Sequence, residues 1–386
     1  MRTIATKAAK KPAATPVAVI KADDAEFLRR ALRLAKRGEG RVEPNPMVGC
    51  VLVKDGKIIG EGYHRKFGTA HAEVNALKVA GADVRGATAY VTLEPCCITA
   101  KTGPCTDALI AAKVARVVVG TLDPNPRING DGVRALRKAR IRVVTGVEDE
   151  AAADLIAPFR KLMLEKRPWV IAKWGQSLDG KVATSTGESK WITDDAMRQH
   201  ANRTRGRLDA IIVGINTVLA DDPQLTARLD TPRRIAARVV LDSFLRTPLK
   251  CNLVRTAPNI PTWIFCTNAA RSDHAAQLER AGCRVTRVGK AVGGVALPDV
   301  LKHLGEANFT NVLVEGGSKI LGAFFEQRLV DEIHAYVAPK LIGGRNAPGI
   351  WHTNGVEKLE NAIDFTTAAT SKKIGSGWLI SGRLKK

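Results

Sequence analysis

Long apolar runs are absent from the 386-residue sequence. None approaches the roughly 20 residues that a helix needs to cross a bilayer, so we expect no membrane partner and a cytoplasmic protein. Acidic residues are also few, with 38 Asp and Glu against 60 Lys and Arg, and the formal net charge is +22. A basic surface can bind nucleic acid. Here the basic residues are spread along the whole chain and aromatics make up only 5% of it, which favours a small anionic ligand over nucleic acid.

Disulfide-type spacing is absent too. The sequence holds seven Cys, an odd number, and their spacing suggests no disulfide framework. This usage is typical of a reducing compartment. A Gly-x-Gly-x-x-Gly motif after a first strand is also lacking, and we therefore expect no ordinary Rossmann dinucleotide-binding domain.

Residues 1–21 contain no acid and are rich in Ala, Lys and Pro. This composition predicts a disordered basic tail, whereas a transit peptide would be richer in Arg and Ser. The rest of the chain is long enough for two domains. We predict a first domain at 22–147, a charged linker helix at 148–167 and a second domain at 168–386.

The most informative motif that is present is His71-Ala72-Glu73, followed by Pro95-Cys96 and then by Cys105. A catalytic zinc takes three protein ligands and keeps one position open, and one His with two Cys would fill those three places. Glu73 lies close enough to His71 to serve as a general acid and base. Zinc nucleobase deaminases use such a set to replace a ring amino group by water. Buried structural Cys would give the same pattern by coincidence.

Eight residues separate Cys96 from Cys105. Deaminases that act on nucleic acid usually carry a short Pro-Cys-x-x-Cys, so a deaminase of RNA, which remains an alternative, would have to depart from that pattern. Specific deamination of RNA would support this alternative. Retention on heparin would not, because it would follow from the net charge alone.

Strand-like and helix-like segments alternate around this motif. Strands are predicted at 47–53, 57–59, 87–93, 114–120 and 141–145, with a hairpin turn at Asp55-Gly56 between the first two. Helices are predicted at 71–80 and 104–113. The alternation predicts an α/β fold with a parallel sheet and helices on its faces. Two of the ligands would lie near helix N-termini, whose positive dipole ends favour thiolate over thiol.

The second half has no further His-x-Glu motif or Cys pair of this kind. A strand at 311–314 runs into Gly316-Gly317 and a helix at 319–328. This arrangement offers free N–H groups to a phosphate, although a tight packing turn has the same sequence. The Asp221-Asp222-Pro223 segment could be a catalytic acid pair, but its composition favours a turn or helix cap.

Taken together, the segments resemble the bifunctional deaminase–reductase family of riboflavin biosynthesis over roughly residues 22–384. The matching segments in the first half are Pro44-Asn45-Pro46, Glu61-Gly62-Tyr63-His64, His71-Ala72-Glu73, Thr92-Leu93-Glu94-Pro95-Cys96, Lys101-Thr102, Pro104-Cys105 and Asp123-Pro124-Asn125-Pro126. Those in the second half are Ser177-Leu178-Asp179-Gly180, Gly187-Glu188-Ser189, Trp191-Ile192-Thr193, Thr217-Val218-Leu219, Asp221-Asp222-Pro223 and Ala338-Pro339-Lys340.

The resemblance implies a cytidine-deaminase-like N-terminal domain and a dihydrofolate-reductase-like C-terminal domain. The first would use zinc to remove an amino group from a diaminopyrimidinone that carries a phosphoribosylamino arm. The second would use NADPH to reduce the ribosyl chain to a ribityl chain. The family also implies a homo-oligomer, either a dimer or a tetramer.

Residue roles follow from the same resemblance. Zinc ligands would be His71, Cys96 and Cys105, and Glu73 would carry the proton. Deaminase substrate positions match Asn45, His64 and Lys101. Cofactor positions match Gly175, Trp191, Thr217, Asp221, Ser243 and Gly317. Reductase substrate positions match Ser189, Arg205, Leu225, Arg228 and Glu315, where Arg205 and Arg228 could clamp a phosphate.

One loop departs from the family pattern. After Cys96 the family usually has a His where this chain has Ile98, and Ala100 and Gly103 replace a Gly and a Pro. All three zinc ligands remain, but Ile98 cannot donate a hydrogen bond to substrate. We therefore expect a weakened or adapted deaminase, with a reductase that carries a relic first domain as the alternative.

Overall fold

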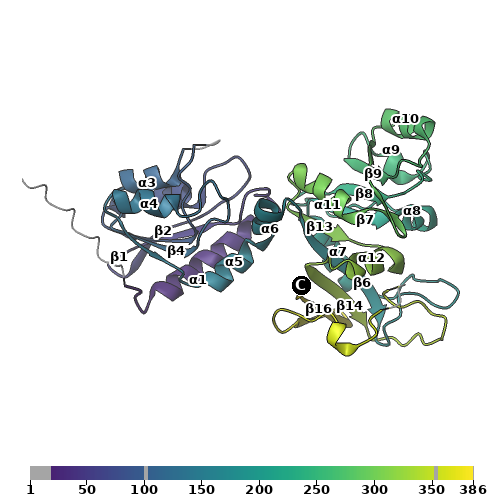
Figure 1. Ribbon diagram of the computed structural model, residues 1–386. Coiled ribbons are helices and arrows are strands. Elements are labelled where there is room, and N and C mark those ends of the chain that lie inside the picture. Colours follow the sequence, from purple (N-terminus) through teal and green to yellow (C-terminus); the bar gives the residue numbers. More distant parts are fainter. Residues whose placement is uncertain (1–18, 100–102, 352–354, 386) are drawn as a thin grey trace, which may run out of the picture. The chain divides into compact units, whose positions relative to one another are not determined.

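The computed structural model describes residues 19–99, 103–351 and 355–385. Two compact units make up the chain. Unit 1 holds the described residues of Met1–Gly38 and Met47–Ile156, and unit 2 those of Glu39–Pro46 and Ala157–Lys386. The short segment Glu39–Pro46 therefore groups with the second unit although it is flanked on both sides by the first. Each unit is an α/β structure built on its own sheet (Figure 1).

Unit 1 holds a five-stranded sheet in the order β2-β1-β3-β4-β5. The strands are β1 Gly49–Lys54, β2 Lys57–Tyr63, β3 Thr88–Leu93, β4 Arg116–Thr121 and β5 Arg142–Thr145. The β1–β2 and β1–β3 pairs are antiparallel, and β3, β4 and β5 run parallel. The hairpin predicted at Asp55-Gly56 is confirmed, whereas the sheet is mixed rather than wholly parallel because this hairpin forms its edge.

Helices cover both faces of this sheet. Those of unit 1 are α1 Asp24–Ala35, α2 Ala72–Ala80, α3 Cys105–Ala111, α4 Asp131–Lys138 and α5 Asp149–Leu155, with short 3-10 turns at Lys36–Gly38 and Gly81–Val84. One core joins α2, α3 and α4 to the sheet, and a second core joins α1 to its other side (Figure 1). The helix predicted at 71–80 is confirmed with its end at Gly81. His71 is its N-cap residue.

Glycines let α2 lie directly on strand β2. A side chain at Gly60 would crowd the backbone of Ala76, and one at Gly62 would overlap the backbone of Ala72 and Ala76. The first turn of α2, which carries the His71-Ala72-Glu73 motif, is therefore held against the sheet at backbone distance.

Unit 2 holds a nine-stranded sheet in the order β10-β9-β8-β7-β13-β6-β14-β16-β15. The strands are β6 Trp169–Ser177, β7 Ala210–Gly214, β8 Ala237–Leu241, β9 Thr262–Cys266, β10 Arg284–Arg287, β13 Asn311–Val314, β14 Glu332–Ala338, β15 Thr370–Ile374 and β16 Gly377–Arg383. From β10 to β14 every neighbouring pair is parallel, and β16 and β15 add an antiparallel edge. A small separate hairpin pairs β11 Lys290–Ala291 with β12 Gly294–Val295.

Two large cores line the faces of this sheet. The helices of unit 2 are α6 Ala157–Glu165, α7 Asp195–Arg205, α8 Ile215–Asp221, α9 Asn252–Arg255, α10 Ser272–Arg280, α11 Leu297–Glu306 and α12 Ser318–Glu326, with a 3-10 turn at Leu359–Asn361. Residues of α11 and α12 pack into one core, and residues of α8, α9 and α10 into the other. In the part of the chain that the structure describes, no helix is both long and apolar enough to cross a bilayer.

The charged stretch predicted as one linker helix is divided. Helix α5 ends at Leu155 and belongs to unit 1, whereas α6 begins at Ala157 and belongs to unit 2. Pro158 explains the break, because it has no N–H to donate to the carbonyl of residue 154 and its ring would clash there.

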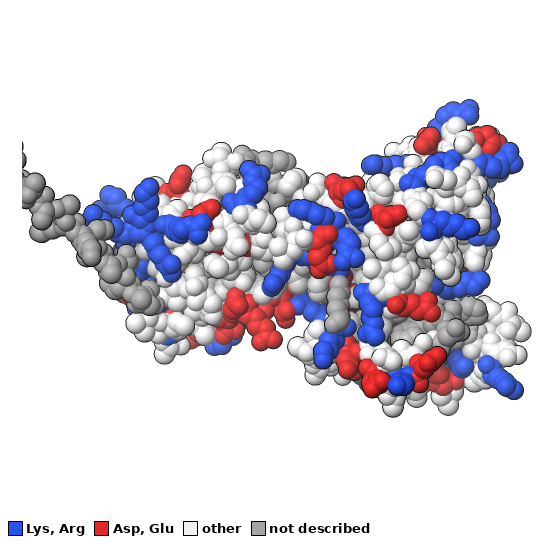
Figure 2. Space-filling model, viewed as in Figure 1, with Lys and Arg blue, Asp and Glu red and all other residues white. Residues whose placement is uncertain are grey.

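Charge is distributed over both units. On the face shown in Figure 2, Lys and Arg side chains are interspersed with Asp and Glu and do not form a single stripe. This view agrees with the even spread of basic residues along the sequence.

Candidate active sites

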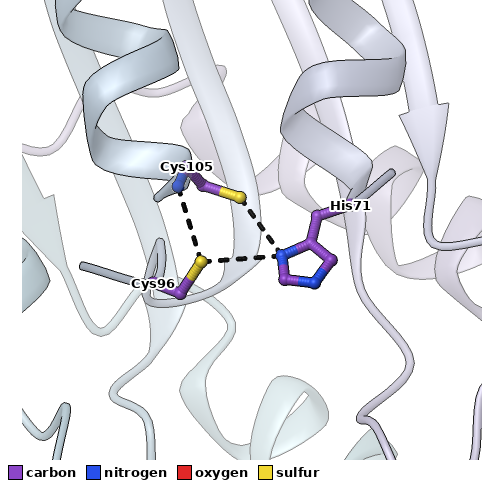
Figure 3. A group of neighbouring side chains, drawn as sticks. All are labelled: His71, Cys96 and Cys105. Atoms are coloured by element: carbon purple, nitrogen blue, oxygen red, sulfur yellow. Dashed lines mark hydrogen bonds between the residues drawn. The ribbon is translucent and has the colours of Figure 1, made fainter. Parts of the chain in front are cut away.

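The predicted zinc ligands come together in unit 1. His71 caps the N-terminus of α2, Cys96 follows β3 in a loop, and Cys105 is the first residue of α3 (Figure 3). The Nδ1 atom of His71 lies 3.3 Å from the Sγ of Cys105 and 3.5 Å from the Sγ of Cys96. All three ligand atoms lie within 4.8 Å of one another.

These distances suit a tetrahedral zinc. With Zn–N near 2.0 Å and Zn–S near 2.3 Å, tetrahedral ligand atoms lie about 3.5 Å apart for N and S. Three ligands of this kind leave a fourth position for water, as catalytic zinc sites do. The donor set and its geometry therefore fit the metal.

Local electrostatics favour a thiolate at Cys96. A hydrogen bond from the Cys105 thiol, together with the contact to His71, holds the pKa of Cys96 well below its usual value. The backbone N–H of Cys105 also points to the Cys96 sulfur at 3.4 Å. This N–H belongs to the first turn of α3, where the helix dipole is positive.

Glu73 lies beside the three ligands and is buried, with 3% of its surface exposed. Burial, reinforced by the negative charge at Cys96, raises the pKa of Glu73 to about 7. A carboxyl group with such a pKa can both accept and donate a proton near neutral pH.

Among the other predicted deaminase positions, His64 contacts the predicted zinc ligand His71. His64 is buried, its Nδ1 lies 3.2 Å from the carbonyl oxygen of Ala70, and its ring contacts the His71 ring edge-on at 5.1 Å. Asn45 is half-buried and lies in the Glu39–Pro46 segment that groups with unit 2. Lys101 lies outside the described residues. Ile98 is half-buried in the loop after Cys96.

The predicted reductase positions follow the ends of parallel strands. Gly175 lies near the end of β6, Thr217 on α8 after β7, Ser243 after β8, and Glu315 with Gly317 after β13. Because β8, β7, β13 and β6 are adjacent and parallel, these residues share one edge of the sheet. Open α/β sheets bind their ligands at this edge.

Glu315 is the centre of a buried ion cluster. Arg205 donates two hydrogen bonds to its carboxylate, from Nε at 2.8 Å and Nη2 at 2.6 Å. The Nζ atom of Lys173 lies 3.7 Å from the same carboxylate. Burial alone would raise the pKa of Glu315, but the charges of Arg205 and Lys173 outweigh it and lower the pKa to about 2. Sequence reasoning missed Lys173, which lies mid-strand in β6 among apolar residues.

The expected cofactor positions differ in how closely other residues pack against them. A side chain at Gly316 would crowd the Oγ1 of Thr217, and one at Gly175 would meet Thr193. Gly317 is the N-cap residue of α12, and a side chain there would meet open space. The Trp191 ring is 62% exposed with the Arg198 guanidinium 4.2 Å from its centre. Ser243 lies against Gly294 of the small hairpin.

Asp221 and Asp222 behave as the turn interpretation predicts. Asp221 ends α8 and pairs with Lys190 at 3.2 Å. Asp222 has a left-handed backbone with φ 39° and accepts hydrogen bonds from Asn252 at the start of α9. In the loop that follows, Leu225 and Arg228 also have positive φ, and Leu225 is buried whereas Arg228 is exposed. Ser189 is exposed.

Comparisons with known proteins agree with both halves. Residues 21–121 match the model of the cytidine and deoxycytidylate deaminase zinc-binding region, and residues 168–380 match that of the RibD C-terminal domain. The riboflavin biosynthesis protein RibD of Actinobacillus pleuropneumoniae is 42% identical over 350 residues, which cover 90% of this chain and 92% of the relative. That of Escherichia coli K12 is 41% identical over 354 residues, covering 89% and 94%.

Solved structures match at full length. Form 1 of Acinetobacter baumannii RibD superposes with a TM-score of 0.83 at 36% identity, covering 94% of this chain and 99% of that one. The diaminohydroxyphosphoribosylaminopyrimidine deaminase/5-amino-6-(5-phosphoribosylamino)uracil reductase of Thermotoga maritima gives a TM-score of 0.80 at 36% identity, with the same coverage.

Fold and sites thus define a zinc deaminase joined in one chain to a reductase that uses NADPH. The predicted cytidine-deaminase-like and reductase domains are confirmed. The chain belongs to the RibD family and is a bifunctional deaminase and reductase of riboflavin biosynthesis.

Proposed function

We propose that this enzyme deaminates 2,5-diamino-6-(5-phosphoribosylamino)pyrimidin-4-one and then reduces the ribosyl chain of the product to ribityl. The observation that carries the proposal is the joint presence, in one chain, of the His71, Cys96 and Cys105 cluster beside buried Glu73 and of the Glu315 cluster at the ends of parallel strands. The printed name of the Thermotoga maritima relative gives the same pair of reactions.

In the deaminase, His71, Cys96 and Cys105 would hold zinc. When bound, zinc lowers the pKa of a water molecule and so supplies a nucleophile near neutral pH. Glu73 would accept the proton of that water and pass it to the amino group, which leaves as ammonia. Asn45, His64 and Lys101 would bind the pyrimidine substrate, with His64 adjoining the metal through its contact with His71.

In the reductase, NADPH would supply the hydride that turns the ribosyl chain into a ribityl chain. Gly175, Trp191, Thr217, Asp221, Ser243 and Gly317 would bind this cofactor. The Arg205 guanidinium already donates two hydrogen bonds to the Glu315 carboxylate. We therefore propose that Arg205 orients that carboxylate. Exposed Arg228 would then be the phosphate clamp. Ser189, Leu225 and Glu315 would complete the substrate site.

We further propose that the enzyme acts in the cytoplasm as a dimer or tetramer, with functional domains at 22–147 and 168–386. Light scattering after size exclusion tests the oligomeric state.

A coupled assay tests the reaction pair. The zinc-loaded full chain is given the diamino substrate and NADPH, and ammonia release and NADPH oxidation are followed separately. We expect one ammonia and one NADPH per substrate, and removal of zinc by a chelator should stop both. NADPH oxidation of a supplied deaminated substrate should continue without zinc. Ammonia release from the chelated enzyme at the original rate would contradict the zinc assignment.

A further inference from the structure

Glu94 is a buried carboxylate that the proposed chemistry does not use. It follows directly after β3, has 3% of its surface exposed, and is separated from Cys96 by Pro95 alone. Its backbone N–H donates to the carbonyl of Thr121 at 3.0 Å, so the position next to the metal loop is still tied to strand β4.

The Glu94 carboxylate accepts hydrogen bonds from three backbone N–H groups. Its Oε2 accepts from Asp123 at 3.2 Å and from Gly130 at 2.8 Å, and its Oε1 accepts from Val133 at 3.1 Å. The donors lie 29 to 39 residues further along the chain, in the loop after β4 and in the first turn of α4. One side chain therefore joins the end of β3 to two other segments.

The Glu94 carboxylate caps the N-terminus of helix α4. Its N-cap residue is Gly130, which has φ 89° and no side chain that could accept a hydrogen bond from the first turn. The N–H of Val133, at the third helical position, is a group that an N-cap side chain normally satisfies. Glu94 satisfies it from another strand, and its negative charge also lies at the positive end of the helix dipole.

The first turn of α4 also packs closely against the Pro95 peptide, which precedes Cys96. A side chain at Gly132 would overlap the carbonyl oxygen of Pro95, so α4 approaches this peptide at backbone distance. On the other side, the N–H of Thr106 in α3 donates to the carbonyl of Cys96 at 3.2 Å. The Cys96 backbone is thus held between α3, which carries Cys105, and the α4 start that Glu94 fixes.

From this geometry we infer that Glu94 is a positioning residue that holds Cys96 in place as a metal ligand. The inference rests on the proposed zinc site. Groups that orient metal ligands typically change metal affinity by about 10- to 100-fold when they are removed. Loss of the Glu94 carboxylate would free both the α4 start and the Pro95 peptide, and Cys96 would no longer be held at ligand distance from His71 and Cys105.

A matched control separates positioning from general stability. Asp24 is a second buried carboxylate of unit 1, fully buried, and it accepts hydrogen bonds from Arg116 at 2.6 Å and from Tyr90 at 3.1 Å. Asp24 lies in α1, its partners Tyr90 and Arg116 lie in β3 and β4, and none of the three is a metal ligand. Asp24→Asn should therefore lower the stability of unit 1 without changing how zinc is held.

The test measures zinc release from the full zinc-loaded chain into a colorimetric chelator, for wild type, Glu94→Ala, Glu94→Gln and Asp24→Asn. We expect both Glu94 variants to release zinc about 10 to 100 times faster than wild type. Glu94→Gln keeps the shape and one acceptor oxygen, so it covers the case in which Glu94→Ala does not fold. Asp24→Asn should release zinc at the wild-type rate even though it melts earlier.

The outcomes distinguish two failures. Wild-type protein that binds no zinc would contradict the proposed metal site itself. Wild-type protein that binds zinc while Glu94→Gln releases it at the same rate would overturn only the role of Glu94, as would an Asp24→Asn variant that loses zinc equally fast. All six Trp of the chain lie between Trp169 and Trp378, so Trp fluorescence independently reports whether unit 2 is intact in each variant.

Discussion

At the scale of single residues, protonation state decides what each site can do. Glu73 and Glu315 are both buried carboxylates, with 3% and 6% of their surfaces exposed. Burial beside a thiolate raises the pKa of Glu73 to about 7, whereas the cations Arg205 and Lys173 lower the pKa of Glu315 to about 2. The first group can therefore exchange protons at neutral pH, and the second remains a fixed negative charge.

Replacing Ile98 by His tests whether this position limits the deaminase reaction. A polar contact to a buried substrate group is worth on the order of 1–3 kcal/mol, which corresponds to roughly 10- to 100-fold in rate. We predict that Ile98→His raises the deaminase kcat/KM by that factor and leaves the reductase unchanged. Equal ammonia release by wild type and Ile98→His, measured with the same zinc content, would show that position 98 does not limit the reaction.

His200 predicts a pH dependence of stability. Burial, reinforced by the positive charges of Lys372, Arg203, Arg207 and His334, lowers its pKa to about 4, and its Nδ1 contacts the buried Tyr336 hydroxyl at 2.9 Å. The fold thus favours neutral His200. This stabilisation is complete above the reference pKa of 6.5 and is lost as pH falls towards 4.

The measurement is urea unfolding of unit 2 at pH 7 and pH 5, followed by Trp fluorescence. Wild type should lose more unfolding free energy between the two pH values than His200→Gln, which cannot titrate. The same loss in both proteins would show that His200 is not responsible.

At the scale of elements, close helix–strand packing positions the metal site. Replacing Gly62 by Ala would place a methyl group into the backbone of α2 at Ala72 and Ala76. We predict a loss of about 1–3 kcal/mol in the stability of unit 1, typical of overpacking. Deaminase activity and zinc content should fall, because the displaced α2 carries His71 and Glu73. The reductase rate is the internal control, and an equal loss of both activities would contradict a local effect.

Several helix, strand and turn positions could be predicted from the sequence. Short-range signals were reliable: Gly81 ends α2, Asp55-Gly56 turns the hairpin, and the Asn311–Val314 strand lies where its apolar run is. The division of the linker at Pro158 also had a local signal, a proline inside a helical pattern, but charge and periodicity outweighed it in our prediction.

Long-range partners could not be predicted in this way. Arg205 and Glu315 are 110 residues apart, and only the sheet order places α7 and the end of β13 together. In the sequence, Lys173 is only one polar residue within an apolar strand, and Glu94 is only a residue close to the predicted zinc ligand Cys96. Their partners are backbone groups or charges from distant segments, which no local pattern of residues encodes.

At the scale of the whole molecule, we assign one reaction to each unit. Glu73→Gln should lower ammonia release from the diamino substrate by about 100- to 10,000-fold, since a positioned proton carrier contributes that much. Glu315→Gln should abolish NADPH oxidation, because Arg205 and Lys173 lose the carboxylate that they surround.

The most direct test is therefore to measure both readouts in both variants, with zinc content and Trp fluorescence as checks on the metal and on unit 2. We predict that Glu73→Gln loses ammonia release yet oxidises NADPH normally when given the deaminated substrate, and that Glu315→Gln releases ammonia normally yet oxidises no NADPH. Normal ammonia release by Glu73→Gln, or the loss of both reactions in either folded variant, would show that the two reactions are not divided between the units in this way.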